Sequence, residues 1–394
     1  MQYITLLPRK EQSLERKHPW IFSGAIKSAS DTIEEGDIVE VRSSNDEFLC
    51  LGHSAVGSIS VRVLSFENVE INQEWWNQRI ADALEARKVI NLPNEKTNCY
   101  RAVHGEGDLL PGLIIDIYNH TAVIQCHSVG MYLERSKISL ALQNAMGDDL
   151  HAVYDKSKNT IPPKSDITTF DSYIYKADGY KGEGEIIENG HKFQPNWEEG
   201  QKTGFFLDQR DNRELVAYYA KNRRVLNTFC YTGGFSVYAL ANGATKCTSV
   251  DSSEKAIRLC KSNIELNNPT GEHNEVVTDA LQFVREMEKD AYDLVILDPP
   301  AFAKHQGALN NALQGYKRLN AKAMASMPKN SILFTFSCSQ AVSKDLFRQA
   351  IFSAAVIAKR EVKILHFLSQ GADHPVNIYH PEGEYLKGLV LLVQ

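Results

Sequence analysis

The pattern of apolar and polar positions changes character near residue 208. Beyond that point, short apolar stretches alternate with segments of helical spacing. The pattern predicts strands at 224–229, 246–250, 275–277, 292–297 and 331–336, and helices at 208–221, 234–242, 253–267, 280–289 and 310–327. Such alternation predicts an α/β fold with a parallel, doubly wound sheet. The last apolar segments, 361–368 and 386–393, have no helix between them and predict an antiparallel edge pair.

The first half of the chain follows a different pattern. Residues 36–66 contain short apolar runs between turn residues, at 38–41, 49–51 and 59–64, which predicts a small β-rich domain. A helix at 73–89, strands at 112–117, 121–126 and 172–176, and a helix at 131–146 predict a central α+β unit. We therefore divide the chain into domains 1–72, 73–176 and 177–394.

Composition narrows the class of protein. The 394 residues are 43% apolar and 23% charged, as in a water-soluble globular chain of two or three domains. The first thirty residues lack a signal-peptide pattern, and no apolar stretch is long enough to span a membrane. The seven cysteines are scattered without a C-x-x-C pair, so we expect a cytoplasmic protein with no disulfide framework and no metal site.

Charge is unevenly distributed along the chain. The net charge of −6 argues against bulk binding of nucleic acid, but residues 299–344 contain no Asp or Glu and six Lys or Arg. A solvated helix face normally mixes both signs, so we interpret this run as a contact for phosphates. The candidate RNA contacts from this region are Phe302, Lys304, Lys317 and Arg318.

A turn after the first predicted strand of the α/β region is the candidate cofactor site. Residues 225–236 form a buried strand, a tight turn and a helix start, with Gly233 and Gly234 in the turn. A Gly-Gly turn is also an ordinary helix entry. The candidate cofactor contacts in the turn are Phe229, Tyr231, Thr232 and Gly233.

Acidic residues after the next two strands support a nucleoside ligand. Asp251 follows the turn by about 20 residues, where doubly wound folds place a carboxylate for ribose hydroxyls, and Ser252 lies beside it. The alternative role of Asp251 is to cap the N-terminus of the helix that follows. Asp279, after the third strand, is placed to accept from an adenine amino group.

The turn does not fit a dinucleotide. Cys230 and Thr232 stand where G-x-G-x-x-G requires glycine, which disfavours a pyrophosphate. S-adenosylmethionine carries no phosphate, so the sequence favours this cofactor.

The fourth strand ends in Asp298-Pro299-Pro300-Ala301-Phe302, a motif that indicates methyl transfer to a base. The prolines fix the loop and hold Asp298 toward the cleft. Enzymes that methylate exocyclic amino groups usually carry an aromatic residue directly after the second proline, and here Ala301 occupies that place. A carbon acceptor is therefore favoured, with a guanine or adenine amino group as the alternative.

Cys338 follows the fifth strand, at the same edge of the predicted sheet as Asp298. A thiolate that adds to carbon 6 of cytosine activates carbon 5 toward a sulfonium methyl group. A lone cysteine is more often a small buried apolar residue. Its place opposite the acid favours a nucleophile, and we interpret the other six cysteines as structural.

Four motifs along the chain resemble one family. They are His18–Gly24 (HPWIFSG), Val103–Glu106 (VHGE), Leu110–Leu113 (LPGL) and Lys202–Arg210 (KTGFFLDQR). Together with the motifs above, they are similar to the bacterial large-subunit ribosomal RNA cytosine-5 methyltransferases that carry an N-terminal PUA domain. Within the last motif, we assign Lys202 to RNA and Arg210 to the cofactor.

The resemblance implies a PUA domain, a central α+β domain and a class I methyltransferase domain that acts on a cytosine of 23S ribosomal RNA. It also implies Cys338 as the nucleophile, without the second cysteine that other RNA cytosine-5 enzymes carry after the proline, since Pro300 and Ala301 stand there. A non-catalytic RNA-binding or ribosome-assembly factor is the alternative from another class, and a homodimer stays open.

Overall fold

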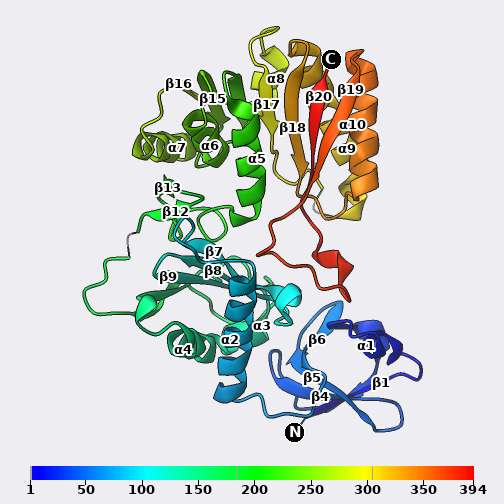
Figure 1. Ribbon diagram of the computed structural model, residues 1–394. Coiled ribbons are helices and arrows are strands. Elements are labelled where there is room, and N and C mark those ends of the chain that lie inside the picture. Colours follow the sequence, from blue (N-terminus) through cyan, green and yellow to red (C-terminus); the bar gives the residue numbers. More distant parts are fainter. Residues whose placement is uncertain (1, 183, 304) are drawn as a thin grey trace. The chain divides into compact units, whose positions relative to one another are not determined.

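The computed structural model describes residues 2–182, 184–303 and 305–394 (Figure 1). Its contacts divide the chain into two compact units. The first contains the chain up to Ile187 together with 195–207 and 372–383, and the second contains 188–194, 208–371 and 384–394. The chain therefore passes between the units five times.

The first unit begins with a six-stranded sheet in the order β2-β6-β5-β4-β1-β3. Its elements are β1 (Tyr3–Leu6), α1 (Gln12–Glu15), β2 (Trp20–Phe22), η1 (Ser23–Ala25), β3 (Ile26–Ala29), β4 (Ile38–Arg42), β5 (Phe48–Ser54) and β6 (Ile59–Ser65). Alternate residues of the strands, such as Val39, Val41 and Val61, fill a core of their own. The three predicted strands are confirmed, whereas β1 to β3 have only three or four residues each and were not predicted.

A second sheet in the same unit has the order β11-β10-β9-β8-β7. Its elements are α2 (Gln73–Val89), β7 (Cys99–His104), η2 (Gly105–Asp108), β8 (Leu113–Tyr118), β9 (Thr121–Cys126), α3 (Val129–Leu133), α4 (Arg135–Met146), η3 (Gly147–Asp149), β10 (Ala152–Asp155) and β11 (Ser172–Lys176). Helix α2 packs on α4 and on β7. The single helix predicted at 131–146 is two helices, because Ser128 caps an earlier start and the first helix ends at Leu133, with Glu134 between it and the second.

The second unit contains a seven-stranded sheet in the order β16-β15-β14-β17-β18-β20-β19. Its strands are β14 (Arg224–Thr228), β15 (Lys246–Asp251), β16 (Glu272–Val277), β17 (Leu294–Leu297), β18 (Ser331–Ser337), β19 (Val362–Leu368) and β20 (Lys387–Val393). A short hairpin, β12 (Ile186–Glu188) and β13 (His191–Phe193), precedes it. The order reverses between β14 and β17, which is where a doubly wound sheet binds its ligands.

Helices cover the sheet in two groups. They are α5 (Arg210–Ala220), α6 (Gly234–Ala241), α7 (Glu254–Leu266), α8 (Ala280–Glu286), α9 (Leu309–Ser326) and α10 (Lys344–Ala358), with the short helices η4 (Leu207–Gln209), η5 (Gln306–Ala308) and η6 (Pro381–Gly383). Helix α6 contacts α5 and α7, whereas α9 contacts α8 and α10 (Figure 1). The prediction of a parallel, doubly wound sheet is confirmed.

The end of the chain differs in two details. The predicted edge pair is antiparallel, but β20 lies between β18 and β19 and pairs antiparallel with both. Helix α10 was not predicted, although Phe347, Ala350, Ile351 and Ala354 are buried at helical spacing. Among the residues that the structure describes, no helix has both the length and the apolar character needed to cross a membrane.

Candidate active site

The turn after β14 has an unusual backbone. Phe229 and Tyr231 adopt φ values of 55° and 47°, and Gly233 adopts 79°. Non-glycine residues rarely adopt such angles, so two of them in one turn indicate a conformation that the surroundings enforce. A Cβ atom at Gly233 would lie 2.3 Å from the Cys260 Sγ, which explains the glycine. The turn packs directly on helix α7.

Asp251 holds this turn to the next helix. One carboxylate oxygen accepts from the Tyr231 N–H at 3.0 Å, and the other accepts from the Ser253 N–H at 2.9 Å. The helix N-cap is Ser253, whose hydroxyl accepts from Ala256, so Asp251 is not the cap. Each carboxylate oxygen keeps a further lone pair that can accept from a ligand hydroxyl.

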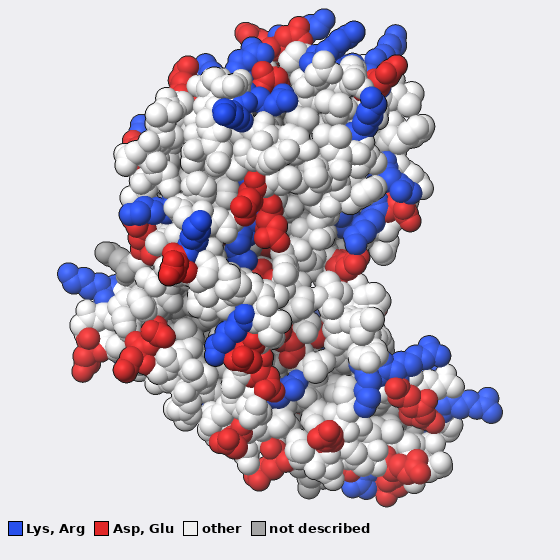
Figure 2. Space-filling model, viewed as in Figure 1, with Lys and Arg blue, Asp and Glu red and all other residues white. Residues whose placement is uncertain are grey.

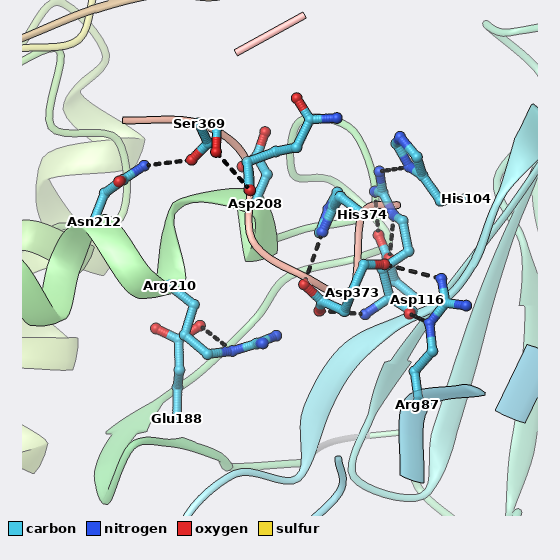
Figure 3. A network of polar contacts seen from close by, with 12 residues as sticks. Arg87, His104, Asp116, Glu188, Asp208, Arg210, Asn212, Ser369, Asp373 and His374 are labelled. Carbon is cyan, nitrogen blue, oxygen red and sulfur yellow. Dashed lines mark hydrogen bonds and ion pairs between the residues drawn. The ribbon is translucent and has the colours of Figure 1, made fainter. Parts of the chain in front are cut away.

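The other predicted cofactor residues lie around the same strand ends. Thr232 is buried, and its carbonyl accepts from the Asn263 side chain at 2.9 Å. Ser252 and Asp279 are exposed, and Asp279 caps α8 by accepting from the Gln282 N–H at 2.8 Å. Arg210 is buried at the start of α5, 3.8 Å from the Glu188 carboxylate (Figure 3).

Asp298 lies directly after β17, in a partly buried polar site where no ion pair with a described residue balances its negative charge. It accepts from the Gln209 side-chain amide at 2.9 Å. Burial and the neighbouring Asp208 carboxylate raise the pKa of Asp298 to about 7. Asp208 accepts from the Tyr385 hydroxyl at 2.6 Å, and its other oxygen is buried without a hydrogen-bond partner among the described residues. Two carboxylates thus share a site in which neither forms an ion pair with a described residue.

Cys338 follows β18 and is close to the same acid. Its Sγ lies 4.0 Å from the carbonyl oxygen of Pro299, in the Asp-Pro-Pro loop. Burial and then the Asp298 carboxylate raise the pKa of the thiol to about 11. The structure therefore brings Asp298 and Cys338 together at adjacent strand ends. In contrast, the other six cysteines are buried.

Lys387 is a site residue that the sequence did not reveal. It opens β20, is buried, and donates from Nζ to the Ser339 carbonyl at 2.7 Å. Burial lowers the pKa of Lys387 to about 8, while the Cys338 thiolate opposes that shift. A buried lysine at the start of an otherwise apolar strand was the available signal. Asp208 and Gln209 were also missed as site residues, although they lie in a motif already noted.

The floor beneath Cys338 is a hydroxyl network. The Tyr316 hydroxyl contacts the Ser339 hydroxyl at 3.0 Å and accepts from the Ser337 hydroxyl at 2.9 Å. Ser339 also accepts from the Ala303 N–H at 3.2 Å. These bonds tie the end of β18 to the loop after β17, which fixes the thiol relative to the acid.

The predicted RNA contacts fall in different surroundings. Phe302 packs on the Tyr316 ring at 4.7 Å and is partly buried, and Arg318 on α9 is exposed. Lys317 is partly buried, Lys202 is exposed in the first unit, and Lys304 lies outside the described residues. Figure 2 shows acidic and basic side chains interspersed on the face in view, in keeping with a patchy distribution of basic charge.

The two neighbouring carboxylates, Asp208 and Asp298, fit a cationic cofactor. Asp208 and Asp298 offer negative charge and an unpartnered oxygen, which would suit the ammonium and sulfonium groups of S-adenosylmethionine. The hydrogen-bonded Asp251 suits a ribose. These residues belong to one unit and to neighbouring ends of its sheet.

Comparison with protein families agrees with this site. Residues 176–382 match the model of an S-adenosylmethionine-dependent methyltransferase family, and residues 4–66 match a PUA-like domain. The cofactor predicted from the turn is thus confirmed. The crystal structure of SMU.776 complexed with SAH has a TM-score of 0.84 at 23% identity, with full coverage of both chains.

Curated relatives align along nearly the whole chain. The Pseudoalteromonas atlantica protein "Ribosomal RNA large subunit methyltransferase I" is 40% identical over 99% of both chains. The protein of the same name from Alteromonas mediterranea is 38% identical over 98% of both chains. The chain therefore belongs to the ribosomal RNA large subunit methyltransferase I family and is an S-adenosylmethionine-dependent methyltransferase.

Proposed function

We propose that this protein methylates carbon 5 of a cytosine in 23S ribosomal RNA through a covalent adduct with Cys338. The observation that carries the proposal is the placement of Cys338 and Asp298 at adjacent strand ends of the methyltransferase sheet. The names of the relatives support large-subunit ribosomal RNA as the substrate. The PUA-like domain supports RNA as the partner.

The two side chains have complementary tasks. In the proposed reaction, the Cys338 sulfur forms a bond to carbon 6 of the cytosine, while the Asp298 carboxyl gives a proton to ring nitrogen 3. Carbon 5 then behaves as an enamine carbon and forms a bond to the methyl group. Bound S-adenosylmethionine supplies that methyl group as an electrophile.

The carbon–sulfur bond of the donor breaks as the methyl group is transferred, which would leave a neutral thioether. The carbon 5 proton then passes to water, the sulfur–carbon 6 bond breaks to release the Cys338 thiolate, and ring nitrogen 3 returns its proton to Asp298. The thiolate regains the proton that the thiol gave to water at the start, so one proton is released overall.

The electrostatics of the site support these assignments. An acid whose pKa is about 7 is partly protonated at neutral pH, so Asp298 can donate a proton. The Cys338 thiol is a weak acid, and the buried Lys387 ammonium favours its thiolate form. A bound base displaces water from the site. Apart from burial, the Asp298 carboxylate is the strongest cause of the raised pKa of Cys338, so protonation of Asp298 favours the thiolate.

Substrate and cofactor contacts follow from the same geometry. We assign the turn formed by Phe229, Tyr231, Thr232 and Gly233 to the cofactor, with Asp251 and Ser252 at the ribose and Asp279 at the adenine. Arg210 is buried beside Glu188, so its effect on the cofactor would pass through the packing of α5. We assign five residues to the RNA: Lys202, Phe302, Lys304, Lys317 and Arg318.

The test is a covalent trap. RNA from cells that lack the enzyme, prepared with 5-fluorocytidine, should form a stable complex because fluorine at carbon 5 cannot leave as a proton. We expect Cys338→Ala to abolish the complex and to reduce methyl transfer by more than about 10³-fold. Cys50→Ala is the matched control, because Cys50 is buried in the N-terminal core. Methylation by Cys338→Ala at the parent rate would disprove the covalent route, and mass spectrometry that finds a methylated amino group would disprove the acceptor.

A further inference from the structure

Three potential metal ligands meet in the first unit, far from one another in the sequence. His18 lies just before β2, and His380 and Glu382 lie in the segment 372–383, with Glu382 inside η6. The Glu382 carboxylate is 3.9 Å from the His18 Nε2 and 3.8 Å from the His380 Nε2. One ligand atom from each side chain falls within 4.8 Å of the others.

The His380 imidazole is unsatisfied as the chain stands. The residue is 3% exposed, and neither ring nitrogen has a hydrogen-bond partner among the described residues. A buried polar group without a partner costs about 1–3 kcal/mol, so native chains retain such a group only where something else satisfies it. The ring is aimed at the cluster, since its Nε2 faces Glu382 and its centroid is 5.5 Å from that of His18.

Neighbouring groups hold both histidines in place. Trp20 packs edge-on against His380 at 4.3 Å, and its indole N–H donates to the Glu106 carboxylate at 2.8 Å. The His18 Nδ1 lies 3.3 Å from the Trp20 carbonyl. A histidine that donates from Nδ1 to a backbone carbonyl leaves Nε2 as a lone pair, which is the usual arrangement around a metal-bound imidazole. The Trp20 N–H approaches the same nitrogen at 3.2 Å, so a metal ion would select between the two tautomers.

We propose that His18, His380 and Glu382 bind a zinc ion. Two imidazoles and one carboxylate form a common zinc ligand set, with bonds of about 2.0–2.2 Å and an open fourth position for water. Tetrahedral bonds of that length place donor atoms about 3.3 Å apart. The two Glu382 distances must therefore shorten by about 0.5 Å, and the three ligand atoms, which now lie within 4.8 Å of one another, must draw together around the ion. The Glu382 side chain is 54% exposed and lies in a single short helical turn, which allows the movement and gives the ion an entry path.

The site would fasten the segment 372–383 to the N-terminal domain. His18 and Glu382 are 364 positions apart. The Trp20–His380 ring contact joins the same regions, and a bond from the Asn377 amide to the Glu106 carbonyl at 3.1 Å joins the segment to the central domain. A bound metal ion would connect the two regions through His380 and Glu382 of this segment and His18 of the N-terminal domain. We therefore expect zinc to protect residues 372–383 from proteolysis.

The test uses the full-length chain in a Cys338→Ala background, so that the partly exposed thiol cannot bind the ion. Zinc is titrated by calorimetry after treatment with a chelator. We expect one equivalent to bind, Glu382→Gln to weaken binding at least about 10-fold, and His18→Ala combined with Glu382→Gln to abolish it. His120→Ala is the matched control, because it removes another histidine of the first unit, outside the cluster.

Two further measurements keep the proposal falsifiable if a variant folds poorly. Cobalt bound in place of zinc should show the visible absorption of four-coordinate cobalt, and Glu382→Gln should lose it. Zinc should slow cleavage within 372–383 in the parent and in His120→Ala but not in Glu382→Gln. Equal zinc affinity in the parent and in the cluster variants, or no binding by the parent, would overturn the proposal.

Discussion

Buried carboxylates are used in opposite ways in the two units. In the central domain, Asp116 receives two bonds from the Arg101 guanidinium, at 2.7 and 2.8 Å, and a third from the Thr203 hydroxyl at 2.6 Å. In the methyltransferase unit, Asp208 and Asp298 oppose each other, and neither forms an ion pair with a described residue. Removing one partner from the first arrangement would leave a charge uncompensated, whereas the second arrangement holds unfavourable charge that a cationic ligand would relieve.

The acids around Asp116 in the first unit are also paired. Arg87 binds both oxygens of Asp108 and also donates to the Asp373 carbonyl at 2.9 Å, and Asp373 accepts from the Arg101 N–H (Figure 3). Every carboxylate in that network has a cation or an N–H as a partner. Pairing, more than burial alone, separates these structural acids from the acid to which we assign a catalytic role, Asp298.

The largest expected effects come from neutralising one acid of each kind. Asp298→Asn should reduce methyl transfer by about 10²–10³-fold, because the acid that protonates the base is lost, and should raise the stability of the ligand-free chain. Asp116→Asn should lower the free energy of unfolding by about 3–5 kcal/mol, because it removes the charged partner of the Arg101 guanidinium, whose side chain is 14% exposed. Urea denaturation and an RNA methylation assay check both variants.

An exposed acid serves as the control for this pair. Asp31→Asn should change neither measurement, because Asp31 is exposed in a loop of the N-terminal domain. If Asp298→Asn destabilised the ligand-free chain as much as Asp116→Asn does, Asp298 would stabilise the fold as the ion-paired Asp116 does. The proposed difference between the two acids would then be wrong.

A hydrogen-bonded acid in the methyltransferase unit should give an intermediate effect. Asp251→Ala should weaken S-adenosylmethionine binding by about 10- to 100-fold, because a charged acceptor and the anchor of the Tyr231 turn are lost together. Calorimetry measures the affinity. Asp293→Ala is the matched control, since Asp293 precedes β17 at the opposite edge of the sheet and pairs with Arg224. Unchanged affinity in Asp251→Ala would remove this residue from the cofactor site.

The proximity of Asp208 and Asp298 also predicts that the stability of the ligand-free chain depends on pH. The pKa of Asp298 is raised from 3.8 to about 7, so the folded chain retains a proton that the unfolded chain releases. Through this group, the ligand-free chain loses stability as pH rises from about 4 to 7. Urea denaturation between pH 4.5 and 8.5 tests the trend, and Asp298→Asn should flatten it.

The smallest effect concerns Lys387. Lys387→Met removes the cation that favours the Cys338 thiolate, so alkylation of Cys338 by iodoacetamide should slow by about 3- to 10-fold at pH 8. Lys363→Met, an exposed position on the neighbouring strand β19, should leave the rate unchanged. Faster alkylation in Lys387→Met would show that the lysine shields the thiol instead of activating it.

Local patterns in the sequence predicted the sheet and the residues at its edge. Strands β9 and β11 and helix α2 match the predicted bounds because their apolar spacing is regular and their ends are marked by turn or capping residues. The sequence located Asp298 and Cys338 because both follow a buried strand directly. Parallel strands bring such positions to one edge whatever their separation in the chain.

The remaining features depend on contacts that have no local pattern. Lys387 enters the site only because β20 inserts antiparallel beside β18, with Lys387 opposite Ser337. The cysteine spacing suggested no metal site, and the candidate ligands His18, His380 and Glu382 lie in segments that only the tertiary fold brings together. Very short strands, such as β2, β12 and β13, lack the length over which alternation is detectable.

The five crossings between the units have a consequence for the order in which the protein matures. The Arg87 and Arg101 bonds to Asp373 belong to the first unit, yet Asp373 follows these residues by 286 and 272 positions. During synthesis, the Arg87 guanidinium and the Arg101 backbone N–H pair with other groups or water until Asp373 has been translated. The polar network of the first unit can therefore close only after residues 372–383 have been made, and not when residues 1–187 are complete.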